Sequence, residues 1–201
     1  MAATHDRQSI DDNALMLKKD TDDTAAIQQA ARVIRQGGVV LHATEGVWGL
    51  ACNPHDESAV DHVFAHKQRP SAKGLVLIGA EASYFARQLE SCAHREEVLN
   101  SWPGHHTWIL SNEGEYADFI TGGRDTVACR VPGHAQARQL AAAVGTTLVS
   151  TSANISGQPP ISNAQDAMAT FADKVDFALP GEVGSAGRAS TIHGPDRQIL
   201  R

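Results

Sequence analysis

The sequence predicts a single α/β domain built around a multi-stranded, largely buried sheet. Short apolar runs typical of strands alternate along the chain with segments whose apolar residues recur at helical spacing. No long linker, repeat or low-complexity tract interrupts this alternation. The chain has 201 residues, 42% of them hydrophobic and 20% charged, which is enough for one substantial globular domain.

The N-terminal residues 1–20 are polar and mixed in charge, and we expect them to form a flexible arm ahead of a folded domain over 21–201. The first half of that domain begins with a predicted helix, which ends at Gly37 and Gly38. The pattern then predicts, in order, strands at 39–43 and 47–52, a helix at 58–67 and a strand at 74–79. The last of these strands is apolar without alternation, which is typical of a strand buried on both faces.

The second half of the chain continues the same alternation of elements. The pattern predicts two short helical pieces within 81–101, strands at 107–111 and 126–131, a helix over 137–144 ended by Gly145, a strand at 147–150, a helix at 163–174, a strand at 175–179 and a final strand pair at 189–192 and 197–200. In the strand at 126–131, side-chain alternation places Thr126 and Arg130 on one face.

Three cations stand together just before the buried strand at 74–79. Lys67, Arg69 and Lys73 fall within seven residues, and helical spacing places Lys67 on the inward stripe of the preceding helix. One interpretation is a lysine that snorkels and caps the helix C-terminus. The other, which we favour, is a clamp whose three cations bind phosphates.

Residues 150–157 (STSANISG) hold five hydroxyl or amide side chains within seven residues, directly after an apolar run typical of a strand. A cluster of this kind is often no more than a turn. In α/β proteins, however, ligands gather at the carboxyl ends of strands. Together with the cationic cluster, the segment indicates a binding site for a polar ligand.

The bulk composition excludes several classes of protein. A formal net charge of −6 argues against a protein whose main role is to bind bare nucleic acid. There is no apolar run of membrane length, and the polar N-terminus argues against a secretory signal. The chain has an odd number of cysteines, namely Cys52, Cys92 and Cys129, and no two of them form a Cys-x-x-Cys pair. This pattern indicates reduced thiols in a cytoplasmic protein.

Familiar metal and nucleotide signatures are missing from the sequence. His62 and His66 have i, i+4 spacing but lack the adjacent glutamate of the zinc-protease pattern, so we expect no structural metal site. There is no P-loop, and no G-x-G-x-x-G follows a strand. A nucleotide would therefore have to bind by another design.

Six short motifs follow one another in order, within a match that runs from about residue 25 to the end of the chain. They are HATEGVWGL at 42–50, KQRPSAK at 67–73, WPGHHT at 102–107, TVACRVP at 126–132, STSANISG at 150–157 and STI at 190–192. Taken in order, these motifs resemble those of the YrdC family, the threonylcarbamoyl-AMP synthases, in its short single-domain form. The resemblance implies a YrdC-like catalytic domain over 21–201. It also implies a three-layer α/β fold, α+β in some schemes, with a twisted mixed sheet flanked by helices.

Several positions depart from the family pattern. His42 and Ala43 stand in place of the usual residue and proline, Gly46 replaces a threonine, and His105 replaces a proline. His193 and the glycine after it stand near the place of a late aspartate.

The resemblance implies an adenylyl transfer. The amine of threonine captures bicarbonate or carbon dioxide as a carbamate, the carbamate oxygen attacks the α-phosphate of ATP, and pyrophosphate leaves. The product, threonylcarbamoyl-AMP, then passes through downstream transfer proteins to an adenosine beside the anticodon of tRNA. Such a reaction between anions depends on positioning and charge stabilisation more than on a nucleophilic side chain.

Roles for individual residues follow from the local chemistry and the resemblance together. Lys67 and Arg69 are expected to be catalytic, and Thr44, Arg130 and Ser150 to bind threonine. The residues expected to bind ATP are Lys67, Arg69, Lys73, Thr126, Ser152, Asn154 and Arg201. Mg²⁺ is expected to accompany ATP, but no acidic pair identifies its ligands, so no metal-binding residue is assigned.

Two other functions remain open at this point. The cations Lys67, Arg69, Lys73, Arg124 and Arg130 could line a concave surface of a double-stranded RNA- or tRNA-binding module that lacks synthase activity. Such a module would need neither threonine, bicarbonate nor ATP, whereas the synthase needs all three. A carbamoyl-transfer domain, as in hydrogenase maturation proteins, would call for acylphosphatase-like and zinc-finger segments, which this sequence does not contain.

Overall fold

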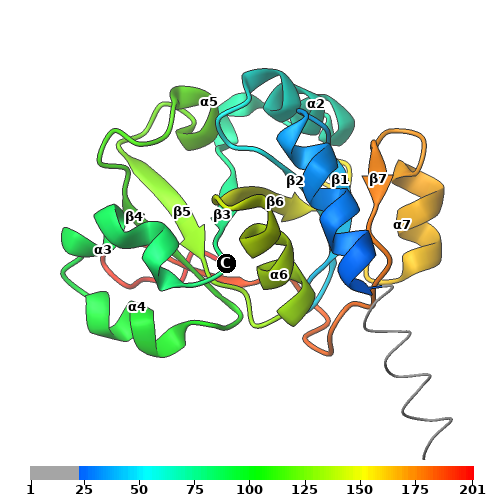
Figure 1. Ribbon diagram of the computed structural model, residues 1–201. Helices are drawn as coiled ribbons and strands as arrows, with labels where there is room; N and C mark the ends of the chain where they lie inside the picture. The colour runs from blue at the N-terminus through cyan, green and yellow to red at the C-terminus, as the bar shows by residue number, and fades with distance from the viewer. Residues whose placement is uncertain (1–22) are drawn as a thin grey trace, which may run out of the picture.

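The computed structural model describes residues 23–201, and its centre is a twisted sheet of eight strands (Figure 1). The expected arm over 1–20 lies outside the described residues. The strand order is β7-β1-β2-β6-β3-β5-β4-β8. The strands are β1 (Val40–Ala43), β2 (Trp48–Cys52), β3 (Val76–Ile78), β4 (His106–Ser111), β5 (Thr126–Arg130), β6 (Leu148–Ser152), β7 (Phe177–Ala178) and β8 (Thr191–His193).

Helices connect most of these strands. A helix over residues 23–35 comes first. It is followed by α2 (Glu57–Lys67), the 3₁₀ turns η1 (Ser71–Lys73) and η2 (Ala82–Phe85), α3 (Ala86–Glu90), α4 (Arg95–Ser101), α5 (Asp118–Thr121), α6 (Ala135–Val144) and α7 (Ala164–Phe171). None of the described helices is both long and apolar enough to cross a membrane.

Helices cover both faces of the sheet, so the fold has three layers. On one face, buried residues of α2, α3, α4 and α7 pack with residues such as Leu50, Leu77 and Cys129 of the central strands. On the other face, the helix over 23–35 and α6 pack against Val40 and Leu148. The predicted three-layer α/β fold is confirmed.

The sheet is mixed, as expected. β1 with β7, β3 with β5, and β4 with β8 run parallel, and the other neighbouring pairs run antiparallel. The apolar run at 74–79 becomes the central strand β3, which lies between β6 and β5. The chain that enters this strand carries the predicted cations, so the topology brings them to the middle of the sheet.

Three local expectations need correction. β6 runs on to Ser152 rather than ending at 150, because residues 150–152 pair with residues 49–51 of β2. The short helix α5 was not predicted. The second strand of the expected C-terminal pair is reduced to a single bridge between His193 and Ile199.

Candidate active site

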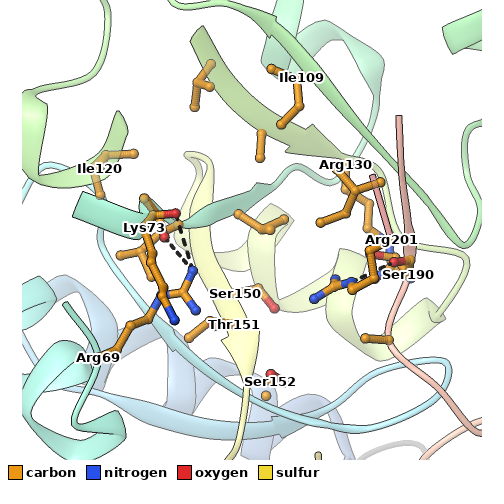
Figure 2. A pocket seen from close by; sticks show the side chains of 18 of the residues that line it. Arg69, Lys73, Ile109, Ile120, Arg130, Ser150, Thr151, Ser152, Ser190 and Arg201 are labelled. Atoms are coloured by element: carbon orange, nitrogen blue, oxygen red, sulfur yellow. Dashed lines mark hydrogen bonds between the residues drawn. The ribbon is translucent and has the colours of Figure 1, made fainter. Parts of the chain in front are cut away.

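A cavity of about 190 Å³ opens over one face of the central strands, and residues of η1 and α5 also line it. Its floor is formed by β2, β3, β5 and β6, and the C-terminal segment with Ser190 and Arg201 forms one wall (Figure 2). Strand register explains the floor, because Ala128 pairs with Val76 and Arg130 with Ile78, so alternate residues of neighbouring strands share this face.

Seven of the ten predicted site residues line this cavity. They are Thr44, Arg69, Lys73, Arg130, Ser150, Ser152 and Arg201. Lys67, Thr126 and Asn154 do not belong to its lining. Thr126 lies on the expected face, but it is the first residue of β5, two residues before Ala128, and does not reach the cavity.

The lining is strongly cationic. Five basic side chains contribute to it, namely Arg69, Lys73, Arg124, Arg130 and Arg201. No aspartate or glutamate occurs among the described residues that line it. The guanidinium of Arg130 lowers the pKa of Arg201, and that of Arg201 lowers the pKa of Arg69, in each case after the larger effect of burial. A bound anion would relieve this repulsion, so the cavity suits a ligand with several negative charges.

Arg69 is held in place by the turn that follows α2. Gln68 adopts a left-handed conformation (φ 48°), which ends the helix directly after Lys67. Nη2 of Arg69 donates to the carbonyl oxygens of Gly74 at 3.0 Å and Lys73 at 3.3 Å (Figure 2). The side chain is thereby preorganised at the edge of the cavity.

Lys67 has a different environment from the one predicted. Its side chain is only 2% exposed, and its Nζ donates to the carbonyl of Ser152, to that of Asn154 at 3.0 Å and to Oδ1 of Asn154 at 3.1 Å. Burial, and then Arg69, lower its pKa to about 8. The ammonium group neither snorkels nor projects into the cavity. It joins the end of α2 to the end of β6, because a buried ammonium needs acceptors and these carbonyls supply them.

Arg130 forms a buried ion pair that was not predicted. Its Nη2 lies 2.5 Å from Oε1 of Glu45, and its Nε donates to the carbonyl of Gly104 at 3.2 Å. The same carboxylate oxygen accepts from the backbone N–H of Gly133 at 2.5 Å. Burial lowers the pKa of Arg130, and Glu45 opposes that shift. The only sequence signal for Glu45 was its place within the motif at 42–50.

The hydroxyl groups of the cavity are tied into local networks. Oγ1 of Thr44 donates to the carbonyl of Val47 at 2.6 Å, and Oγ of Ser152 donates to Oδ1 of Asn154 at 2.7 Å. On the opposite wall, Oγ of Ser190 lies 2.8 Å from Oγ1 of Thr107. The bonds of Thr44 and Ser152 fix the direction of each donor, whereas in the pair of Ser190 and Thr107 either hydroxyl can donate. The sequence had indicated a polar cluster without indicating these bonds.

Ser150 has a buried histidine as its partner. Its Oγ lies 3.1 Å from Nε2 of His42, which is fully buried on β1. Burial lowers the pKa of His42 to about 4. His42 was noted only as a departure from a family motif, and nothing in its local sequence indicates that it reaches β6.

Comparison with known proteins identifies close relatives over most of the chain. A family model named Sua5/YciO/YrdC, with the description "Telomere recombination", matches residues 32–201. A threonylcarbamoyl-AMP synthase of Halorhodospira halophila is 40% identical over 168 residues, which are 83% of this chain and 88% of that protein. One from Idiomarina loihiensis is 39% identical over 178 residues, or 86% of this chain and 96% of that protein.

Solved structures agree with this assignment. The structure of P. abyssi Sua5 complexed with L-threonine is 33% identical, with a TM-score of 0.81 over 87% of this chain and 53% of that one. This chain therefore spans about half the length of Sua5. E. coli YciO, 24% identical with a TM-score of 0.75, shares the fold over 85% of this chain and 84% of its own. By family model, sequence identity and fold together, the chain belongs to the Sua5/YciO/YrdC family.

Proposed function

We propose that this protein is a threonylcarbamoyl-AMP synthase, a nucleotidyltransferase that uses L-threonine, bicarbonate and ATP. The observation that carries the proposal is the cavity over β2, β3, β5 and β6, where five cations meet a row of hydroxyl side chains and no described carboxylate lines the wall. A triphosphate and a carbamate both place negative charge in such a site. The relatives that match most of the chain carry the name of this activity.

The ATP half of the site would be formed by Arg69, Lys73, Ser152 and Arg201. Arg69 and Arg201 present planar guanidinium groups, which bind phosphate oxygens in pairs, and Lys73 adds a point charge. These groups would hold the triphosphate in line for attack at the α-phosphate and stabilise the charge that passes to pyrophosphate.

Three residues that were expected to bind ATP do not line the cavity, and in this proposal they contribute from behind its lining. They are Lys67, Asn154 and Thr126. Lys67 fixes the carbonyls of Ser152 and Asn154, and Asn154 in turn accepts from the Ser152 hydroxyl. In this proposal Lys67 supports catalysis by holding the end of β6 in place. For Thr126, the supporting observation is its position on the cavity face of β5.

The threonine half would comprise Thr44, Arg130 and Ser150. Arg130 would pair with the threonine carboxylate, since a guanidinium matches a carboxylate with two parallel hydrogen bonds. Its ion pair with Glu45 orients the guanidinium before the substrate arrives. The structure of Sua5 with L-threonine supports a threonine site in a protein of this fold.

Mg²⁺ would enter with ATP rather than on protein ligands. The ion prefers carboxylate and phosphate oxygens, and the described lining of the cavity offers no carboxylate. Among residues 23–201 there is also no group of three or more His, Cys, Asp or Glu side chains arranged to hold a metal. The protein residues therefore do not fit a magnesium site of their own.

The product would be passed on to tRNA by downstream transfer proteins, in the cytoplasm. Binding of RNA alone is not favoured as the function, because the formal net charge is −6 and the cations gather inside a cavity. Weak contact with tRNA is compatible with this reaction but is not needed for it.

Pyrophosphate release tests the proposal directly. The purified protein is given ATP, Mg²⁺ and bicarbonate with each of the twenty amino acids in turn. Release should occur with threonine and should stop when threonine, bicarbonate or ATP is omitted. The proposal would be contradicted if pyrophosphate release were the same with and without bicarbonate, or the same for all amino acids.

A further inference from the structure

His42 reaches from one strand to another across a third. It lies on β1, whereas its hydrogen-bond partner Ser150 lies on β6, and β2 runs between them. The residue of β2 paired with His42 is Gly49. A Cβ at Gly49 would lie only 3.1 Å from Nε2 of His42, so the missing side chain makes room for the imidazole to cross the strand.

The hydrogen bonds of His42 decide which way the Ser150 hydroxyl points. Nδ1 of His42 lies 3.1 Å from the carbonyl oxygen of Ala43, which can only accept, so Nδ1 carries the proton. The neutral ring then has an acceptor at Nε2, and the Ser150 hydroxyl must donate to it. With its proton used in this way, Oγ of Ser150 offers only lone pairs to the cavity that it lines.

We propose that His42 is a positioning residue that makes Ser150 a fixed hydrogen-bond acceptor for the amino group of the substrate threonine. The ammonium group of threonine and the N–H of its carbamate are both donors, so one hydroxyl orientation serves the substrate before and after carboxylation. A carboxylate or phosphate oxygen cannot donate to Ser150. The contact thus steers the amine toward Ser150 and leaves the carboxylate to Arg130. This inference rests on the proposed function.

A role of His42 as a base for the threonine ammonium fits the structure less well. The ring is fully buried, and its lowered pKa keeps it neutral and a poor proton acceptor. His42 also does not line the cavity, so the imidazole cannot contact a ligand bound there directly. The imidazole is therefore placed to act through Ser150.

A double-mutant cycle on the full-length protein tests the inference. Threonine and ATP dissociation constants are measured by calorimetry for the wild type, Ser150→Ala, His42→Leu and the double variant. Each single change should weaken threonine binding on the order of tenfold, as expected for one hydrogen bond to a charged group. If His42 acts through Ser150, the double variant should also lose on the order of tenfold, not hundredfold. ATP affinity should stay nearly constant.

Two further variants keep the test decisive. His42→Gln retains an acceptor near Nε2 and should recover most of the threonine affinity lost in His42→Leu. Gly49→Ala should displace the imidazole and weaken threonine binding, with little further loss when Ser150 is already alanine. This variant is informative even if His42→Leu fails to fold, which thermal unfolding of every variant would reveal.

The possible outcomes separate the two proposals. No threonine binding by the wild type would overturn the proposed function itself. Normal threonine binding combined with additive losses in the cycle, or with no loss in His42→Leu, would overturn the role of His42 alone. The same loss in Gly49→Ala with and without Ser150 would have the same consequence.

Discussion

Arg69 shows how one side chain can be prepared for an anion. Two backbone carbonyls hold its Nη2, and burial followed by Arg201 lowers its pKa without depriving it of charge at neutral pH. Arg69→Ala should reduce kcat/KM for ATP by roughly two to three orders of magnitude, because a preorganised charge contact is lost. Arg69→Lys should also be impaired, since an ammonium cannot replace a two-pronged contact.

Steady-state pyrophosphate release at varied ATP concentration measures this effect. Arg95→Ala, which removes an exposed arginine of α4 outside the cavity lining, is the matched control and should behave as the wild type. Near-normal kinetics of Arg69→Ala would show that Arg69 is not part of a phosphate clamp.

Arg130 should recognise threonine more than ATP. In Arg130→Gln the substrate carboxylate loses the two parallel hydrogen bonds of the guanidinium. Threonine binding should therefore weaken by about 1.5–3 kcal/mol, the range for hydrogen bonds to charged groups. Calorimetry with threonine and ATP separately would measure both. Because Arg130→Gln leaves the half-buried Glu45 carboxylate without its cationic partner, the control is the double variant Glu45→Gln/Arg130→Gln. A large loss for ATP with unchanged threonine affinity would place Arg130 in the other half of the site.

His42 should make the stability of the protein depend on pH. Its pKa is about 4 in the fold and near 6.5 when unfolded. Between these values the unfolded chain binds the proton more readily, so folding loses stability as pH falls from 6.5 toward 4. A shift of that size corresponds to about 3 kcal/mol.

Denaturant unfolding of the wild type and His42→Gln at several pH values checks this prediction. The unfolding free energy of the wild type minus that of His42→Gln should decrease as the pH falls from 6.5 toward 4. Above pH 7 this difference should be constant. A pH-independent difference would mean that His42 has the same pKa in both states.

At the scale of single elements, the end of α6 depends on one glycine. Gly145 has φ +87° and donates its N–H to the carbonyl of Ala141, and a Cβ there would meet nothing within 4 Å. Gly145→Ala should therefore lower the unfolding free energy by roughly 1–2 kcal/mol through backbone strain alone. Gly145→Asn should cost less, since asparagine tolerates this conformation better. Thermal unfolding measures both, and pyrophosphate release should not change.

The departure of Gly46 from the family motif also has an explanation at this scale. A Cβ at Gly46 would lie 2.0 Å from the carbonyl oxygen of Arg188. The backbone of Ala186 donates to the carbonyl of Glu45 nearby, so the segment leading to β8 packs directly on the turn between β1 and β2. The glycine permits this close approach and keeps the C-terminal segment next to the turn between β1 and β2.

For the molecule as a whole, we predict that no zinc is present in stoichiometric amount. His62 and His66 stack with ring centroids 6.2 Å apart, but within residues 23–201 no third ligand joins them. A structural zinc site needs four ligands. Elemental analysis after dialysis should show far less than one zinc per chain. One zinc per chain, lost in a His62→Ala/His66→Ala variant, would contradict this prediction.

Much of the fold follows from the sequence because local pattern controls local structure. Helical spacing identified α2 and the burial of Lys67, and alternation in β5 placed Arg130 on the face that became the cavity. The extent of β6 was misjudged, because hydroxyl residues favour turns locally while pairing with β2 keeps them extended. The short helix α5 has too few residues for a periodic signal.

The sequence by itself determined most of the element types, the resemblance to the family and seven of the residues that line the cavity. Only the tertiary structure decided which buried group meets which partner. Lys67 is bound by the carbonyls at the end of β6, Arg130 by Glu45, and Ser150 by His42. The physical reason is strand order: β1, β2 and β6 become neighbours although more than a hundred residues separate His42 from Ser150. A buried polar group must find a partner, but the partner depends on that order, which no local pattern contains.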